Sequence, residues 1–252
     1  MQYNSKTVVV TGGARGIGYA IAKAFSERDY LVFICDLDLD EVNEAASTLQ
    51  NTKGFQVDVT DEGKIRELIK HVAEEYGGIH VLINNAGLQH IDKVEDFPLE
   101  KWNLLLNVML TGPFLTTKYV VPYMKKQQFG RIINISSVHG KSASPYKAAY
   151  ISAKHGVVGL TRTVAIETAN DGVTVNAIMP GATRTKLIEN QLAKLAEQDS
   201  ISEQEALEAN LLIKQPMKRL LDPEEIADTA VFLASEKAAA ITGECVSVSG
   251  GW

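Results

Sequence analysis

A tyrosine and a lysine four residues apart, with a serine thirteen residues before the tyrosine, are the residues of this chain best suited to acid–base chemistry. Tyr150 and Lys154 would lie on one face of a helix. An ammonium beside a phenol stabilises the phenolate and lowers a tyrosine pKa that is ordinarily about 10. Such a tyrosine can exchange a proton with an alcohol oxygen near neutral pH, close to Ser137. By spacing alone, an exposed i,i+4 pair is the alternative.

A glycine-rich segment near the amino terminus has the composition of a phosphate-binding turn. Residues 11–18 read TGGARGIG, between a β-branched run and a helical segment that begins at Ile17. Gly12 permits a tight turn, Gly16 lets the backbone approach a pyrophosphate, and Gly18 allows close helix–strand packing. The helix start offers unpaired N–H groups to phosphates. This order predicts a dinucleotide site, with a plain turn as the alternative.

Acidic residues after the second predicted strand indicate which dinucleotide is preferred. Asp36 can accept hydrogen bonds from the adenosine ribose hydroxyls and would repel a 2′-phosphate. Arg15 in the glycine-rich segment points the other way, because a guanidinium can pair with a 2′-phosphate. Leu37 adds no second cation and Asp38 adds a negative charge. We therefore expect NAD as the cofactor in preference to NADP.

Two later segments are also expected to contact the cofactor. Asp58, followed by Val59, closes the third predicted strand and can accept a hydrogen bond from the adenine amino group. The alternative is a helix-capping carboxylate, although Thr60 and Asp61 suit that role better. The fourth predicted strand ends in NNAG, residues 84–87, and the small residues there suit backbone packing against a cofactor. Within it, Asn85, Ala86 and Gly87 are the candidate contacts.

Strands and helices are predicted to alternate along the chain, which is typical of a parallel sheet covered on both faces. The fold class is α/β: a doubly wound, Rossmann-type sheet of seven parallel strands. The predicted strands are Thr7–Thr11, Leu31–Cys35, Gly54–Val59, Val81–Asn84, Arg131–Ser136, Thr174–Ile178 and Cys245–Val248. The predicted main helices are Ile17–Arg28, Leu39–Leu49, Asp61–Tyr76, Leu99–Lys125, Ala149–Ala169 and Pro223–Ala234.

One segment interrupts this alternation. Residues 183–215 have mixed helical character and follow a strand and a Pro-Gly break. An insertion there falls at the carboxyl ends of the strands, where open α/β sheets bind ligands. We expect a substrate lid, with a surface helix pair as the alternative.

Composition narrows the class of protein. The chain has 252 residues, 45% of them hydrophobic, and a formal net charge of -6, which suits one globular domain over residues 1–252. Its basic residues are scattered, so we expect no nucleic-acid partner. No signal peptide and no apolar stretch near 18 residues is evident, so we expect a cytoplasmic protein with no membrane contact. Cys35 and Cys245 are expected to be buried free thiols in a reducing compartment, and no metal-ligand spacing is present.

The whole chain resembles the short-chain dehydrogenase/reductase family. The resemblance is carried by TGGARGIG (11–18), Asp58, NNAG (84–87), Asn107, Ser137, YISAK (150–154) and Pro180-Gly181.

The resemblance implies a role for each matching residue. Tyr150 is the general acid/base, Lys154 holds the nicotinamide ribose and lowers the tyrosine pKa, and Ser137 hydrogen-bonds the substrate oxygen. Asn107, expected to face inward from the long predicted helix, holds a water that relays protons to Lys154. A solvent-facing residue is the alternative for Asn107. Four residues are expected at the nicotinamide end: Pro180, Gly181, Thr183 and Thr185.

Polar residues around this set suggest an anionic substrate. Lys147 precedes Tyr150 by one helical turn, and with His139 and glutamine amides it would make a donor-rich site for a carboxylate. Ordinary surface positions are the alternative for Lys147 and Gln191. The segments NAGLQH, SVHG, YKAAY and KQP resemble the 3-hydroxybutyrate dehydrogenases within the family. That likeness implies carboxylate contacts from Gln89, His139, Lys147 and Gln191, and a pocket closed by Trp252.

Two departures affect the substrate prediction, and one is that the stretch TRTK (183–186) is more polar than its counterpart in the 3-hydroxybutyrate group. The 3-hydroxybutyrate group has a tryptophan after the Pro-Gly pair, where this chain has Ala182. The missing indole either enlarges the pocket or is replaced by residues of the lid.

These observations predict an NAD-dependent enzyme that interconverts a small 3-hydroxy acid, such as 3-hydroxybutyrate, and its 3-oxo acid, acetoacetate. The alternatives are a dehydrogenase or reductase for a ketone, polyol or 3-oxoacyl substrate, and a non-catalytic NADH-binding sensor. The resemblance further implies a homotetramer.

Overall fold

The structure, a computed structural model, describes residues 5–199 and 201–252, apart from the side chains of residues 191, 194, 195, 198 and 199. Its centre is a seven-stranded sheet in the order β3-β2-β1-β4-β5-β6-β7, in which every neighbouring pair is parallel. The strands are β1 (Thr7–Thr11), β2 (Leu31–Asp36), β3 (Thr52–Gln56), β4 (Val81–Asn84), β5 (Gly130–Ile135), β6 (Val173–Pro180) and β7 (Cys245–Val248). The prediction of a doubly wound parallel α/β fold is confirmed.

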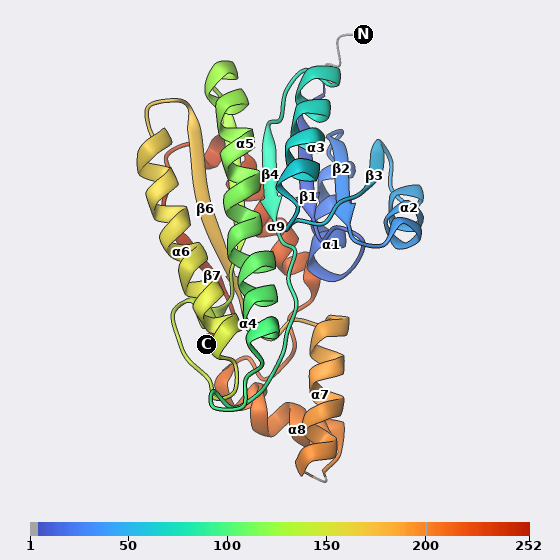
Figure 1. The fold of residues 1–252 in the computed structure, drawn as a ribbon, viewed down its shortest axis with the longest axis vertical. Helices are drawn as coiled ribbons and strands as arrows, with labels where there is room; N and C mark the ends of the chain where they lie inside the picture. Colours follow the sequence, from blue (N-terminus) through green and yellow to red (C-terminus); the bar gives the residue numbers. More distant parts are fainter. Residues whose placement is uncertain (1–4, 200) are drawn as a thin grey trace.

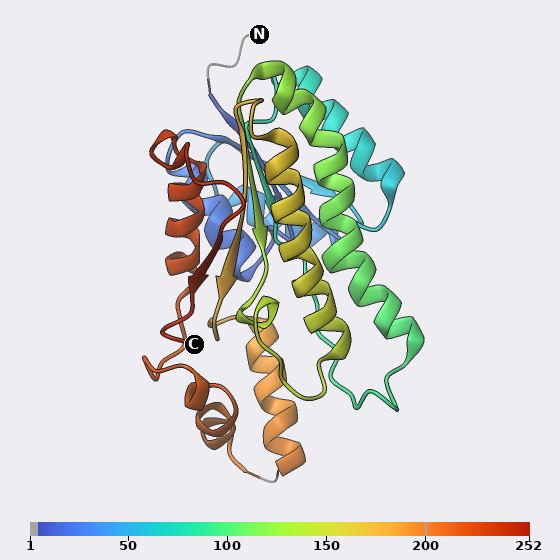
Figure 2. The same cartoon turned by 90° about the vertical axis from the view of Figure 1, so that its left-hand side faces the viewer.

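Helices cover both faces of the sheet (Figures 1 and 2). The central strands are buried on both sides, and alternate residues enter different cores: Val9 packs on one face, while Val8 and Val10 pack on the other. The first core involves α3 (Glu62–Glu75), α4 (Leu99–Leu106), α5 (Gly112–Gln127) and α6 (Ala148–Thr168). The second core involves α1 (Gly16–Ser26), α2 (Leu39–Ser47) and α9 (Pro223–Ala234).

The expected lid forms two further helices, α7 (Lys186–Asp199) and α8 (Glu203–Asn210), followed by the short 3-10 helix η3 (Leu212–Lys214). In Figures 1 and 2 they extend beyond the carboxyl ends of the strands. A small apolar core joins them to the sheet and includes Ala182, Leu192, Ala206 and Leu211. Thr183 bridges Leu221, so the two ends of the lid segment lie together. This placement matches the edge at which a lid was predicted.

The long predicted helix at 99–125 is interrupted. A π-helical turn, η1 (Asn107–Thr111), separates α4 from α5. π-Turns insert one extra residue into a helix and are frequent at functional sites. Here the turn places Gly112 against Val59, where an added Cβ would lie 3.2 Å from the valine side chain.

The third strand was predicted two residues too far along the chain. β3 ends at Gln56, and Asp58 instead forms a local turn in which its Oδ1 accepts hydrogen bonds from the backbone N–H and hydroxyl of Thr60, both at 2.8 Å. Side-chain-to-backbone bonds of this kind compete with strand pairing. Asp61, as expected, caps α3 through Lys64 N–H.

The prediction that no apolar stretch approaches 18 residues was also wrong. Leu99–Gln127, counted as one helix, is long and apolar enough to cross a membrane by length and composition alone, because it contains an 18-residue window with a mean hydropathy of 1.3. Half of that apolar window is buried inside the fold, as in a core helix. Of the two cysteines, Cys35 is buried as expected, whereas Cys245 is only partly buried; both are free.

Candidate active site

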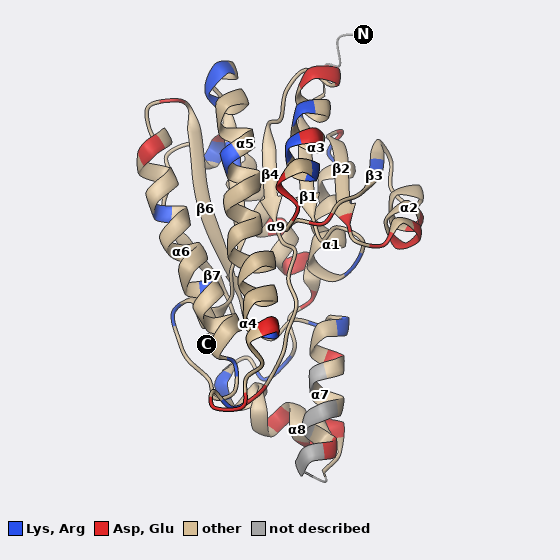
Figure 3. Cartoon of the chain, viewed as in Figure 1, with Lys and Arg blue, Asp and Glu red and all other residues tan. Residues whose placement is uncertain are grey.

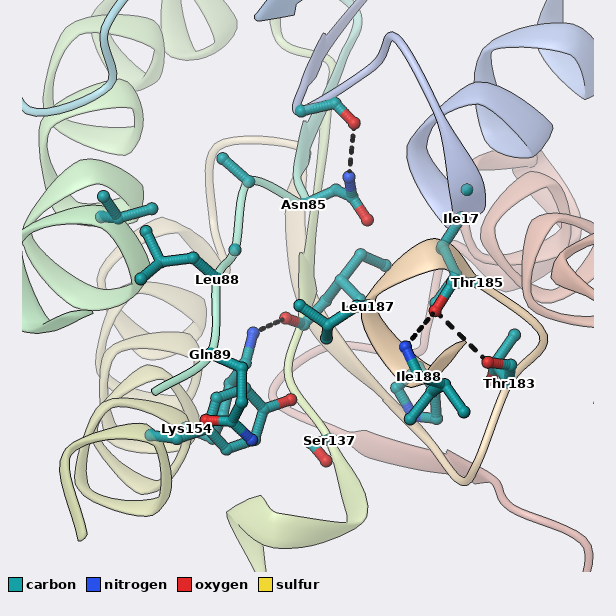
Figure 4. Close-up of a pocket in the computed structure, with 18 of the residues that line it drawn as sticks. Ile17, Asn85, Leu88, Gln89, Ser137, Lys154, Thr183, Thr185, Leu187 and Ile188 are labelled. Atoms are coloured by element: carbon teal, nitrogen blue, oxygen red, sulfur yellow. Dashed lines mark hydrogen bonds between the residues drawn. The ribbon is translucent and has the colours of Figure 1, made fainter. Parts of the chain in front are cut away.

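One cavity of about 430 Å³ opens at the carboxyl ends of the strands and is partly roofed by α7. Almost all of the predicted site residues line it. They are Gly12, Arg15, Gly16, Ile17, Asp36, Asp58, Val59, Asn85, Ala86, Gly87, Gln89, Ser137, His139, Lys147, Tyr150, Lys154, Pro180, Gly181, Thr183, Thr185 and Trp252. Figure 4 shows several of these side chains around the same space.

The glycine-rich turn forms one end of the cavity. Gly12 and Gly16 have φ of +63° and +57°, which glycine adopts at low cost. Gly18 does not line the cavity, but a Cβ there would lie 2.0 Å from the Gly12 carbonyl oxygen. No side chain caps the N-terminus of α1, so its first N–H groups are available to an anion. These features fit the pyrophosphate of a dinucleotide.

The end of β2 forms the far wall of this part of the cavity. Asp36 Oδ2 accepts a hydrogen bond from Ala14 N at 3.2 Å, and its Oδ1 accepts one from Leu37 N at 2.9 Å. The backbone therefore fixes a carboxylate at the position expected for the adenosine ribose. Arg15, the residue that argued for a 2′-phosphate, pairs with Glu41 at 3.3 Å and is largely exposed.

The segment after β4 joins this end to the centre. Asn85 Nδ2 donates to the carbonyl oxygens of Thr11 and Gly12, at 3.1 and 2.8 Å. Asn85 thereby holds the glycine-rich turn against the neighbouring strand end. Ala86 and Gly87, the small residues that follow, leave room in the cavity beside Val108.

Ser137, Tyr150 and Lys154 meet at the centre of the cavity. Lys154 is buried, its Nζ donates to the carbonyl oxygen of Ile135 at 2.8 Å, and it lies 5.6 Å from the centre of the Tyr150 ring. Burial lowers the pKa of Lys154 to about 8, so the ammonium form still prevails at neutral pH.

The expected lowering of the Tyr150 pKa is not found. Burial, the larger effect, raises the pKa of Tyr150, and a hydrogen bond with Ser137 opposes it. Desolvation of the phenolate exceeds the stabilisation available from the protein groups around it. Ser137 is thus the protein group that favours the ionised tyrosine.

His139, Lys147 and Trp252 form the other end of the cavity. The His139 ring lies edge-on to Trp252, with ring centres 5.4 Å apart, and to Tyr150 at 6.0 Å. Burial, together with repulsion from the basic residues Lys147, Lys214 and His155, lowers the pKa of His139 to about 4, so the ring is neutral. Burial and Lys214 lower the pKa of Lys147 to about 8. This end is rich in hydrogen-bond donors and carries positive charge at neutral pH.

Gln89 adds a polar group with no protein partner. Its Oε1 is buried and has no hydrogen bond to any residue that the structure describes. A buried amide oxygen without a protein partner usually accepts a hydrogen bond from a ligand or a water. Turning the amide by 180° would present its NH₂ group at the same place.

Besides Gly18, two predicted site residues are not placed in the cavity. Asn107 is exposed and does not line it, so the expected inward orientation is wrong. The buried stripe of this helix runs through Leu105, Val108 and Met109, and Asn107 falls outside it. The side chain of Gln191 lies outside the described part of α7.

The lid supplies cavity residues that the sequence did not reveal: Leu187, Ile188, Asn190 and Leu211. Thr185 lies just before α7, and its Oγ1 accepts a hydrogen bond from Ile188 N–H at 3.4 Å (Figure 4). Its side chain also lies next to Gly16. Leu211 also packs in the small core with Ala182. The lid therefore fills the space around Ala182. The amphipathic spacing of residues 183–215 predicted helical structure for this segment. It could not show which face of a helix turns toward the cavity.

The fold and this site define an oxidoreductase with a dinucleotide-binding fold, in which a tyrosine, a serine and a lysine line one cavity. A family profile described as "Enoyl-(Acyl carrier protein) reductase" matches residues 12–252. The chain belongs to the short-chain dehydrogenase/reductase family.

Three similar proteins illustrate the range of this family. An uncharacterized oxidoreductase of Bacillus subtilis, YxjF, is 45% identical over 98% of each chain. A D-beta-hydroxybutyrate dehydrogenase of Rhizobium meliloti is 41% identical over 98% of each chain. A solved structure of an actinorhodin polyketide ketoreductase variant with NADPH has a TM-score of 0.94 and 32% identity, over 100% of this chain and 98% of that one.

Proposed function

We propose that this protein is an NAD-dependent dehydrogenase that interconverts a small 3-hydroxy acid and its 3-oxo acid, with 3-hydroxybutyrate as the leading substrate. One observation carries the substrate class: Lys147, His139 and Gln89 line the same cavity as Ser137 and Tyr150. They form a cationic, donor-rich end beside the proton-transfer groups, where a short substrate can reach both. Similarity to a D-beta-hydroxybutyrate dehydrogenase supports the assignment.

The residues present fit a nicotinamide dinucleotide. The glycine-rich turn and the start of α1 would hold its pyrophosphate, and Asp36 its adenosine ribose. When bound, NAD supplies the acceptor for the hydrogen and electron pair that leave the alcohol carbon. The fixed Asp36 carboxylate supports NAD over NADP, although the ketoreductase of similar structure is described with NADPH.

The proton is handled by the protein. In oxidation, the Tyr150 phenolate accepts the alcohol proton, while Ser137 donates a hydrogen bond to the same oxygen and keeps it at a fixed position. The hydrogen bond from Ser137 favours the phenolate before the substrate binds, and the Lys154 ammonium, 5.6 Å from the centre of the ring, lies too far away to offset the burial of Tyr150. In reduction, Tyr150 returns the proton to the substrate oxygen.

The carboxylate end fixes the orientation of the substrate. The Lys147 ammonium and the Gln89 amide can each donate a hydrogen bond to a carboxylate, and a charge-assisted bond is the stronger kind. Trp252 and Leu211 bound the remaining space with apolar surface, which suits a short aliphatic chain.

A second function is supported by the comparisons: reduction of a 3-oxoacyl or polyketide ketone, as the family description and the ketoreductase indicate. Initial rates with NAD and 3-hydroxybutyrate, other 3-hydroxy acids, neutral alcohols and 3-oxoacyl thioesters with NADPH separate the two. We expect the highest kcat/KM with NAD and a 3-hydroxy acid. A higher kcat/KM for a thioester with NADPH would replace this proposal, and tight NADH binding without any turnover would favour the sensor.

A further inference from the structure

A row of hydrogen-bonded side chains runs from the lid to the reacting centre and includes two residues to which no role has been given above. Lys214, in η3, lies 3.2 Å from Ser144 Oγ. Ser144 Oγ lies 2.9 Å from His139 Nε2, and His139 Nδ1 lies 3.3 Å from Ser137 Oγ. Ser137 in turn hydrogen-bonds Tyr150. Neither Lys214 nor Ser144 lines the cavity, so both would act through His139.

The direction of the hydrogen bonds in this row matters for catalysis. A neutral imidazole has one N–H donor and one acceptor nitrogen, and its hydrogen-bond partners decide which is which. If Nε2 carries the proton, Nδ1 can accept only the Ser137 hydroxyl proton, which then points away from the substrate. If Nδ1 carries the proton, it donates to Ser137 Oγ, and the hydroxyl proton is left for the reacting oxygen.

We propose that Lys214 and Ser144 are positioning residues that hold His139 as its Nδ1–H tautomer and thereby turn the Ser137 hydroxyl proton toward the reacting oxygen. An ammonium has donors only, so Lys214 donates to Ser144 Oγ. Its positive charge orients the serine hydroxyl with oxygen toward Lys214 and hydrogen away from it, toward His139 Nε2. Nε2 then accepts, and the single ring proton resides on Nδ1.

Two further observations agree with this arrangement. The backbone N–H of His139 donates to Ser137 Oγ at 3.1 Å, so this oxygen already serves as an acceptor on the histidine side. His139 is neutral at physiological pH, for the reasons given above, so the choice between tautomers is a real one. The groups that face the ring are Lys147, Tyr150 and His155 from α6 and its start, and Lys214 and Trp252 from the segments packed against it.

The end of the lid fixes the position of Lys214 relative to His139. Lys214 is the last residue of η3 and lies 5.7 Å from the centre of the Trp252 ring. Gln215, which follows it, is fully buried and binds Ala182 N through Oε1 at 2.8 Å. The position of Lys214 therefore depends on the packing of the end of the lid against the segment that follows β6, where Ala182 lies.

The tautomer can be measured directly on the full-length protein with ¹⁵N-labelled histidine. We expect a pyrrole-type ¹⁵N shift at Nδ1 of His139 and a pyridine-type shift at Nε2, with the His139→Gln variant identifying the signals. In Ser144→Ala and Lys214→Met, the Nε2–H tautomer should appear. Ser142→Ala is the matched control, because its hydroxyl bonds only Val138 O among the described residues, and it should leave the spectrum unchanged.

Kinetics provide a second readout. With whichever alcohol the enzyme oxidises, Ser144→Ala and Lys214→Met should lower kcat about tenfold, short of the 100-fold or more typical of losing a whole oxyanion donor. KM should change less than about twofold. Lys214→Arg and Ser144→Thr retain the donor and the hydroxyl, and should retain most of kcat.

Only the kinetic test rests on the proposed function, and the ¹⁵N measurement of the tautomer does not. An Nε2–H tautomer in the wild-type protein, or unchanged spectra in both variants, would overturn the proposal. An Nδ1–H tautomer in a protein that does not oxidise 3-hydroxy acids would leave it standing and overturn the substrate assignment alone.

Discussion

At the scale of single residues, Tyr150 has the central role. Replacing Tyr150 with phenylalanine removes the proton acceptor but retains the ring that packs beside His139. We expect kcat to fall at least 100-fold, in keeping with the usual contribution of general acid–base catalysis. NADH affinity, followed by fluorescence titration, should stay within about threefold. Turnover near the wild-type value would show that another group moves the proton.

The pKa of Lys147 predicts how KM for the substrate depends on pH. Its pKa of about 8 means that the cation is present below pH 8 and lost as the pH rises through that value. Because the protonated form binds a carboxylate, KM for 3-hydroxybutyrate should be flat below pH 8 and rise by up to about tenfold per unit above it.

The methyl ester of the same substrate is the control, because it cannot pair with the ammonium. Its KM should not follow that rise, whereas kcat for both substrates also reports Tyr150 and Lys154. A KM for the acid that stays level to pH 9.5 would argue against Lys147 as the carboxylate partner.

Sequence alone anticipated the residue types of the site better than their environments. Asn107 was expected to face inward, but which face of a helix is buried depends on the neighbouring elements, and Asn107 lies beside the buried stripe. The raised pKa of Tyr150 comes from desolvation by residues distant in sequence, which spacing cannot reveal. Ser144 and Lys214 are 70 residues apart, so their contact is a property of the folded chain.

At the scale of elements, a buried polar network holds the strands and helices that carry the site. Asn84 Nδ2 donates to Asn134 Oδ1 at 2.8 Å, and Thr116 Oγ1 donates to Asn84 Oδ1 at 2.6 Å. Asn134 Nδ2 donates to Thr161 Oγ1 at 2.9 Å. The network links β4, β5, α5 and α6, and Ser137 and Tyr150 belong to the segment after β5 and to α6.

Asn134→Ala should therefore destabilise the protein by about 1–3 kcal/mol, because it leaves the Asn84 amide without its acceptor in a buried site. Urea unfolding followed by circular dichroism measures the loss. Asn103→Ala, at an exposed asparagine on α4, should change the free energy of unfolding by less than about 0.5 kcal/mol. Equal effects of the two substitutions would mean that the network contributes nothing.

Element boundaries were predicted well where a strand is apolar on both faces. β1 and β4 have the predicted bounds, because buried parallel strands read as short continuous apolar runs. β7 also has its predicted bounds, although it is a half-buried edge strand. β3 was misplaced because it is an edge strand with exposed residues, so its pattern is weak. The π-turn at Asn107–Thr111 was missed because a helix of either kind has nearly the same hydrophobic spacing over one turn.

At the scale of the whole molecule, charge and exposed apolar surface indicate how the protein meets others. Figure 3 shows Lys and Arg on many separate parts of the ribbon. The outer faces of α5 and α6 carry exposed apolar residues, among them Phe114 and Ile166, at 48% and 81% exposure. Contiguous apolar residues on helix faces are typical of subunit contacts.

A homotetramer assembled through these helices is therefore a prediction. Size-exclusion chromatography with light scattering should give about 110 kDa, four times the chain mass of 27.5 kDa. The double variant Phe114→Glu/Ile166→Glu should shift the protein to smaller species, because it buries charges in the contact. A wild-type mass of a single chain would refute the tetramer.

The central claim is that one cavity holds a substrate carboxylate at Lys147 while Tyr150 exchanges the proton of its hydroxyl group. The most direct test compares kcat/KM for 3-hydroxybutyrate and for its methyl ester, with NAD, in the wild-type enzyme and in Lys147→Met. We predict that the wild type prefers the acid by at least about tenfold, the effect of one charge-assisted hydrogen bond of about 1.5–3 kcal/mol, and that Lys147→Met abolishes this preference. Equal kcat/KM values for acid and ester in the wild type, or a preference that survives in Lys147→Met, would contradict the account.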